Sequence, residues 1–299
     1  MISNINKWVC ILLLSIVFAC QNSNSEINSD QVDVEEIKTH KNKSNVFKKD
    51  TVSNYAHSLY WHWEDEFSDS TKAKLQTWIE IVTEASFNCI GYYQFDIHYY
   101  FHLSDGNEPV PFGHTSRKDE QAVHFYVNPR FSLDDFLADW TAPHEISHLS
   151  TCFVGRKNMW FSEGYATYLS RQIMVDMGCF TDESFDSLYL KKINGIKKYY
   201  NSSTSSFIEV TDSLLSHYRY GPVYWAGSSF FFTADRYLQE NYQIRFTDLV
   251  NSYQSCCRLD DHYLKAVIES YDLLLDDQYF SSLMAKYRNS KSSVVMANY

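Results

Sequence analysis

A paired-histidine motif followed by a nearby acidic residue constrains this chain more than any other feature. His144, Glu145 and His148 form an H-E-x-x-H motif, and fourteen residues separate His148 from Glu163 in the run W-F-S-E-G-Y-A. On an α-helix, residues four apart point in nearly the same direction, so the two imidazoles can reach one ion. Glu145 is turned by about 100° from His144, so it need not be a ligand. The pattern predicts a helix that presents a metal site.

The residue types at this site are those that zinc prefers. Histidine nitrogens and carboxylate oxygens bind Zn²⁺, and a catalytic zinc takes three protein ligands and keeps one position open for water. His144 and His148 supply two ligands, and we expect Glu163, near the start of a second helix, to supply the third. Glu145 is then placed as general base on a zinc-bound water. Cys152 is an alternative third ligand if the first helix continues that far.

This combination resembles the gluzincin zinc metallopeptidases, and within that thermolysin-like superfamily the aminopeptidase N-like branch. The shared string is H-E-x-x-H followed by W-[FL]-x-E-G-x-A, and the resemblance covers roughly residues 113–237, under half of the chain. It implies a zincin-like fold and peptide-bond hydrolysis with Zn²⁺. The segment before Glu163 is four residues shorter than is usual in that branch, which implies a shorter loop between the two helices.

The resemblance extends to a tyrosine but not to an amine-binding signature. Residues 217–221, H-Y-R-Y-G, resemble the Y-x-x-G segment whose tyrosine donates a hydrogen bond to the tetrahedral oxyanion. Tyr218 is the matching position, with Tyr220 or His217 as substitutes. The branch also has a G-x-M-E-N string that holds the substrate's free amino group, and this chain lacks it; only Glu120 stands near the corresponding place. Whether the enzyme trims ends or cuts internally therefore stays open.

The first fifty residues predict export and membrane anchoring. Residues 8–19 are an apolar run too short to span a bilayer comfortably. Residues 17–20, V-F-A-C, resemble a bacterial lipobox, which implies a lipoprotein signal peptide over residues 1–19 and a lipid on Cys20. An ordinary signal peptide or an uncleaved anchor is the alternative. Residues 20–50 are polar and predict a flexible tether, so we expect a lipid-anchored protein of the bacterial cell envelope, on its periplasmic or surface side.

Residues 51–299 predict a single zincin-like metallopeptidase domain of the α+β class. Apolar residues at helical spacing indicate a helix over Ser70–Phe87, with Ser70 as its N-cap. Alternating, aromatic-rich segments indicate strands over Phe95–Leu103 and Gln121–Asn128. We therefore expect a small mixed sheet before the metal-binding helix.

Helices are predicted for most of the chain after the sheet. Proline is tolerated only in a helix's first turn, so Pro143 predicts a separate helix over Ser132–Trp140 and a metal-binding helix that starts at about Ala142. Gly164 and Ala166 are small, and we expect them to let the second helix approach the first closely. Further helices forming a mainly helical C-terminal lobe are predicted over Met159–Met177, Ser184–Tyr199, Tyr220–Tyr242 and the remainder to Lys286.

The charge, cysteine and histidine content of the chain limits the partners, disulfides and further metal sites that we expect. A net charge of −11 argues against nucleic acid, which needs a basic face. We expect a monomer that acts on a peptide or protein. The five cysteines beyond residue 20 are an odd number, and Cys256 and Cys257 pair with each other only under strain, so no disulfide framework is predicted. His98 and His102 lie on a predicted strand, too far apart to share one metal.

Two alternatives accompany the metallopeptidase hypothesis. One is a catalytically weak or inactive zincin-scaffold surface protein that binds peptides or glycans through its aromatic-rich N-terminal lobe. Glu145 argues against it, because a structural zinc site needs no base and tends to be closed by a fourth ligand. The other is a zinc hydrolase for a non-peptide amide or ester, whose site chemistry is the same.

Overall fold

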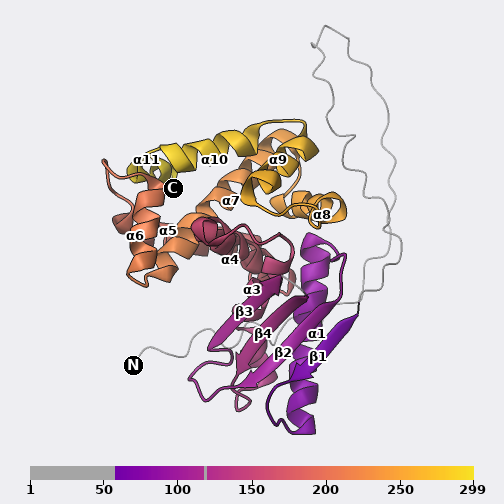
Figure 1. Cartoon of the computed structure of the whole chain (residues 1–299). Helices are drawn as coiled ribbons and strands as arrows, with labels where there is room; N and C mark the ends of the chain where they lie inside the picture. Colours follow the sequence, from indigo (N-terminus) through magenta and orange to yellow (C-terminus); the bar gives the residue numbers. More distant parts are fainter. Residues whose placement is uncertain (1–57, 118–119) are drawn as a thin grey trace, which may run out of the picture. The chain divides into compact units, whose positions relative to one another are not determined.

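The computed structural model describes residues 58–117 and 120–299, which form an α+β fold (Figure 1). This confirms the predicted fold class. The predicted signal peptide over residues 1–19, the lipid on Cys20 and the tether over residues 20–50 lie outside the described residues. Within the described part of the chain, no helix is long and apolar enough to cross a membrane.

A four-stranded mixed sheet with the order β1-β2-β4-β3 forms the N-terminal part. β1, β2 and β4 are parallel, and β3 pairs antiparallel to β4 at the edge. The mixed sheet and the two predicted strands are confirmed, whereas β1 and β3 were not predicted. The strands are Leu59–Trp63 (β1), Ile97–Leu103 (β2), Phe112–Arg117 (β3) and Gln121–Val127 (β4).

The two faces of the sheet differ in burial. On β2, Ile97, Tyr99 and Phe101 are buried, while the side chains between them are half-buried on the opposite face. The buried face packs on α1 (Asp69–Ile90), where Trp78 lies 5.2 Å from Phe125 between ring centroids. The period of two in a strand thus separates a core face from an outer face.

The N-cap of α1 is Ser68 rather than Ser70. The Ser68 side chain accepts a hydrogen bond from the backbone N–H of Thr71 at 3.3 Å, which satisfies one of the unpaired donors in the first helical turn. The helix therefore begins one residue earlier than predicted and ends at Ile90.

Helices make up the rest of the chain, and α3 and α4 lie between the sheet and α7 (Figure 1). The break predicted at Pro143 is confirmed, since α2 ends at Leu137 and α3 begins at Thr141. The helices are α2 (Leu133–Leu137), α3 (Thr141–Leu149), α4 (Met159–Asp176), α5 (Asp182–Ile196), α6 (Phe207–Ser216), α7 (Tyr220–Tyr242), α8 (Phe246–Cys256), α9 (Leu264–Leu275), α10 (Tyr279–Asn289) and α11 (Ser292–Val295).

Two glycines let α4 and α7 cross at backbone contact. A Cβ atom on Gly164 would lie 2.2 Å from the carbonyl carbon of Gly227, and one on Gly227 would lie 2.0 Å from the carbonyl oxygen of Trp160. Gly164 therefore faces α7 and not, as predicted, the helix that carries His144 and His148, which is α3. The close crossing fixes α7 against the helix that carries Glu163.

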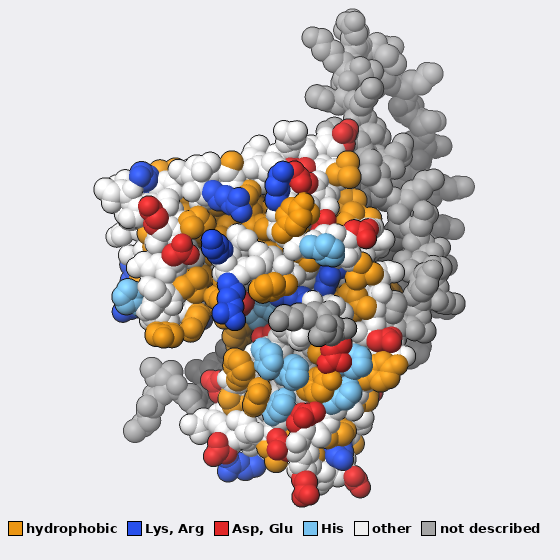
Figure 2. Space-filling view, in the orientation of Figure 1, with side chains coloured by type: hydrophobic (Ala, Val, Ile, Leu, Met, Phe, Trp, Pro, Cys, Tyr) orange, Lys and Arg blue, Asp and Glu red, His pale blue; other side chains and the backbone are white. Residues whose placement is uncertain are grey.

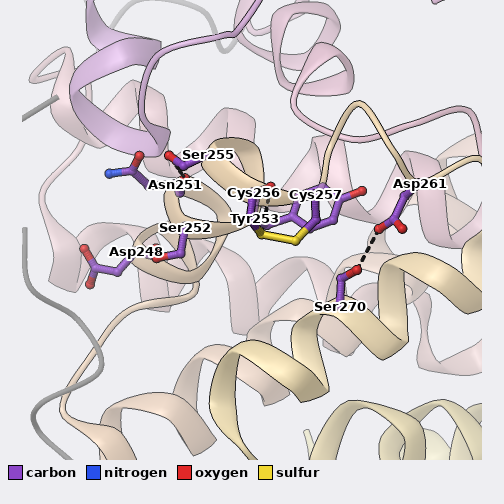
Figure 3. Close-up of a disulfide and its surroundings, with 9 residues drawn as sticks. All are labelled: Asp248, Asn251, Ser252, Tyr253, Ser255, Cys256, Cys257, Asp261 and Ser270. Carbon is purple, nitrogen blue, oxygen red and sulfur yellow. Dashed lines mark hydrogen bonds between the residues drawn. A yellow bond between two sulfur atoms is a disulfide. The ribbon is translucent and has the colours of Figure 1, made fainter. Parts of the chain in front are cut away.

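Adjacent cysteines form a disulfide where α8 ends, which contradicts the prediction that none would form (Figure 3). The prediction rested on the strain that neighbouring cysteines meet. Here Cys256 is the last residue of α8, and Cys257 departs from helical geometry with φ −130° and ψ −20°. The bond therefore joins the last residue of the helix to the first residue beyond it. Cys89 and Cys152 are free thiols.

Candidate metal centre

Helices α3 and α4 bring His144, His148 and Glu163 together. The Oε2 atom of Glu163 lies 3.1 Å from Nε2 of His144 and 3.6 Å from Nε2 of His148. One donor atom from each residue lies within 4.8 Å of the others, and no second such group of three His, Cys, Asp or Glu occurs within residues 58–117 and 120–299. Two nitrogens and one oxygen so placed could hold a metal ion and leave a position open.

Hydrogen bonds behind α3 hold its end in place. Arg117 donates to the backbone oxygen of His148 at 2.6 Å, and Arg258 donates to that of Leu149 at 2.9 Å. These two carbonyls lie in the last turn of the helix, where cationic side chains are stabilising. Burial, and then the charge of Arg258, lower the pKa of Arg117 to about 10, so it stays charged at neutral pH.

A second set of contacts orients the imidazole of His148. The Ser162 hydroxyl lies 3.4 Å from its Nδ1 atom, which turns Nε2 toward Glu163. Because α3 ends at Leu149, Cys152 does not follow on the same helical face and lies outside the three-residue cluster. Burial also raises the pKa of the Cys152 thiol. The structure thus favours Glu163 over the alternative third ligand.

The protonation states of the cluster suit metal binding. Burial favours the neutral form of Glu163, yet the charge of His148 and hydrogen bonds with both histidines outweigh it, so the pKa of this carboxyl lies well below its usual range. Burial lowers the pKa of His148. Ligands coordinate a metal in their deprotonated forms, so an ion would take the place of a proton held between His148 and Glu163.

Glu145 stands beside the cluster and is held by β3. The Thr115 hydroxyl lies 2.8 Å from Oε2 of Glu145 and 2.7 Å from its backbone oxygen. A Cβ atom on Gly113 would lie 2.9 Å from Cγ of Glu145, so the glycine lets β3 approach α3. Glu145 is 8% exposed. Thr115 and Gly113 are functional candidates that the sequence did not reveal, because β3 was not predicted.

A tyrosine of α7 completes the site. The ring of Tyr224 stacks on that of His144, with 5.7 Å between centroids and 19° between planes. Burial, and then the charges of Glu163 and Glu145, raise the pKa of Tyr224, so the phenol keeps its proton and remains a donor.

The structure places the predicted Tyr218 outside this group. Its side chain is 81% exposed, it has a left-handed backbone with φ 57°, and its ring neighbours that of Tyr220 at 6.4 Å. His217 and Tyr220, the predicted substitutes, are also exposed. Glu120, the only residue near an amine-binding position, instead accepts a hydrogen bond from Tyr100 at 2.8 Å, on the sheet face turned away from α3.

No protein-family model matches this sequence, and no curated protein is significantly similar to it. The geometry of the site itself indicates what chemistry it could support. That geometry combines three convergent metal donors, a carboxylate outside the donor set and a protonated phenol.

Proposed function

We propose that this protein is a zinc-dependent metallopeptidase of the gluzincin type with a zincin-like fold. The observation that carries the proposal is the convergence of His144, His148 and Glu163, with Glu145 next to them on α3 but outside the donor cluster. Three protein donors are typical of catalytic zinc, whereas structural zinc is usually closed by four. A free carboxylate at that place favours hydrolysis over a purely structural role.

The residues around the cluster have separate roles in the proposed hydrolysis. When bound, a zinc ion supplies Lewis-acid polarisation of water and of the scissile carbonyl. Glu145 accepts a proton from the attacking water and passes it to the leaving amine. The Thr115 hydroxyl orients that carboxylate at 2.8 Å. Tyr224 donates a hydrogen bond to the oxygen on which negative charge develops in the transition state.

Metal analysis combined with peptide cleavage tests this proposal. Purified full-length protein is expected to contain about one zinc per chain, because the described residues hold one three-donor cluster. It is expected to cleave members of a peptide library, to lose that activity with a chelator and to regain it with added Zn²⁺. Mass spectrometry of the products also separates trimming of ends from internal cutting.

Two results would replace the proposal by another function. Tight binding of peptides or glycans without any cleavage favours the alternative of a surface binding protein on a zincin scaffold. Hydrolysis of small amides or esters with no peptide products assigns the same site to a non-peptide substrate. The proposal of a lipid-anchored envelope protein is tested separately, by metabolic labelling of Cys20 with a fatty acid.

A matched pair of tyrosine variants tests the oxyanion donor. Tyr224→Phe is expected to lower kcat/KM about 10²–10³-fold, the usual loss for one oxyanion-hole donor. Tyr218→Phe is expected to match wild type, because that side chain is 81% exposed. Initial rates on one peptide substrate give the comparison. If Tyr218→Phe lowers kcat/KM and Tyr224→Phe does not, the oxyanion donor is Tyr218, the tyrosine that the sequence pattern favours.

A further inference from the structure

The sheet face turned away from α1 and α3, here called the outer sheet face, is rich in histidine. Figure 2 shows histidine side chains gathered over the sheet. Alternation along the strands directs them there while the intervening residues fill the core. Five of the eleven histidines of the chain belong to this face: His62, His98, His102, His114 and His124.

Four rings form a continuous stack across all four strands. His62 stacks on Tyr100, Tyr100 on His124 and His124 on His114, with centroid distances of 4.2, 4.4 and 4.4 Å and planes within 11° of each other. Because the ring faces cover one another, the stack does not offer a flat surface to a sugar or a base. It offers ring edges, which in histidine carry nitrogen donors.

Two diagonal histidine pairs flank the central Tyr100. Nε2 of His62 lies 2.9 Å from Nδ1 of His98, and Nε2 of His102 lies 3.3 Å from Nδ1 of His124. Two nitrogens bound to one ion at about 2.0–2.1 Å, with an angle of about 90–110°, lie about 2.9–3.4 Å apart. Both pairs therefore match the separation that a shared metal ion requires.

We propose that the outer sheet face binds late first-row divalent transition-metal ions at two separate sites. His62 and His98 form the first, and the carboxylate of Glu120, whose Oε2 lies 3.5 Å from Nδ1 of His98, places a negative charge beside it. His102 and His124 form the second. His98 and His102 do not share an ion, in line with their spacing along β2; each pairs with a neighbouring strand.

The imidazole ligands determine which ions these sites bind most tightly. Imidazole nitrogen suits copper, nickel and zinc, and affinity for a given nitrogen site is highest for Cu²⁺ among these. When an ion replaces the hydrogen bond within a pair, the ring that donated its proton carries it on the other ring nitrogen instead, so no net proton is released. Water completes the coordination of each ion.

Copper titration of the full-length, zinc-loaded protein tests the proposal. Each of the double variants His62→Gln with His98→Gln, and His102→Gln with His124→Gln, is expected to bind one Cu²⁺ per chain fewer than wild type. The control, His217→Gln with His262→Gln, removes two exposed histidines elsewhere and is expected to bind as many as wild type. Electron paramagnetic resonance at neutral pH is expected to show hyperfine coupling to two nitrogens in wild type.

Equal copper counts in the outer-face variants and the control would overturn the proposal, as would copper that only displaces zinc from the His144 cluster. Thermal unfolding establishes that each variant is folded. Nuclear magnetic resonance of the wild-type protein gives a test that needs no variants. Cu²⁺ added below stoichiometry is expected to remove the histidine proton signals of the outer sheet face, and if these signals persist, the proposal fails. The copper count is independent of peptide cleavage, so it does not depend on the proposed function.

Discussion

Replacing Glu145 by glutamine is expected to leave the metal in place and to lower peptide hydrolysis by about 10²–10⁴-fold, the usual contribution of a general base. The amide has nearly the shape of the carboxylate but cannot accept the proton. Glu145 lies outside the donor cluster, so its replacement removes no ligand. The Thr115 hydroxyl, 2.8 Å from Oε2, can donate equally to an amide oxygen, which keeps the side chain in position.

Zinc content and kcat/KM, measured on the same preparation, check this result. Glu163→Gln is the matched control: it makes the same chemical change on α4, within the donor cluster, and is expected to lose metal and activity together. Wild-type hydrolysis by Glu145→Gln would show that the base lies elsewhere. Loss of metal from Glu145→Gln would instead place Glu145 among the ligands.

The clustering of the two histidines could be predicted because their geometry is local. His144 and His148 lie one helical turn apart, so their common direction follows from the helix alone. Glu163 could be predicted as a member of the cluster only from the family resemblance of its W-F-x-E-G-x-A run. Its position depends on the turn between α3 and α4, which helix geometry alone does not give. Cys152 could be separated from Glu163 only once the end of α3 at Leu149 was known.

The tyrosine that we propose as oxyanion donor could not be predicted, because its place depends on how two distant helices cross. Tyr224 reaches His144 and Glu163 since α7 contacts α4 at Gly227, three residues further along. A motif match at Tyr218 carries no information about that crossing. The sequence indicated the crossing only in part, by a glycine on each helix, Gly164 and Gly227. Gly164 was expected to contact α3, whereas it contacts α7.

The sheet shows the same division between local and non-local information. β2 and β4 alternate clearly and were predicted, whereas β3 is polar and includes a glycine. Its strand conformation depends on pairing with β4, and its glycine is needed because Glu145 lies against it. The strand that holds the proposed base, β3, therefore could not be recognised from its own strand propensity. Such a mismatch between local propensity and structure is expected at functional sites.

Replacing Gly227 by alanine is expected to lower the free energy of unfolding by about 3 kcal/mol, the upper end of the usual cost of overpacking. The new Cβ would lie 2.0 Å from the carbonyl oxygen of Trp160, and a backbone atom cannot move aside as a flexible side chain can. α7 must shift away from α4, and Tyr224 moves with it. We therefore expect the variant to lose hydrolysis even where it remains folded.

Gly195→Ala is the control for this substitution. Gly195 also lies in a helix, α5, but its Cβ would meet no atom within 4 Å, so alanine is expected to stabilise by about 0.5–1 kcal/mol through its higher helix propensity. Denaturant unfolding of both variants gives the comparison, with zinc content measured alongside. If Gly227→Ala unfolds at the denaturant concentration of Gly195→Ala and hydrolyses peptides normally, the crossing of α4 and α7 does not position Tyr224, and its proposed role fails with it.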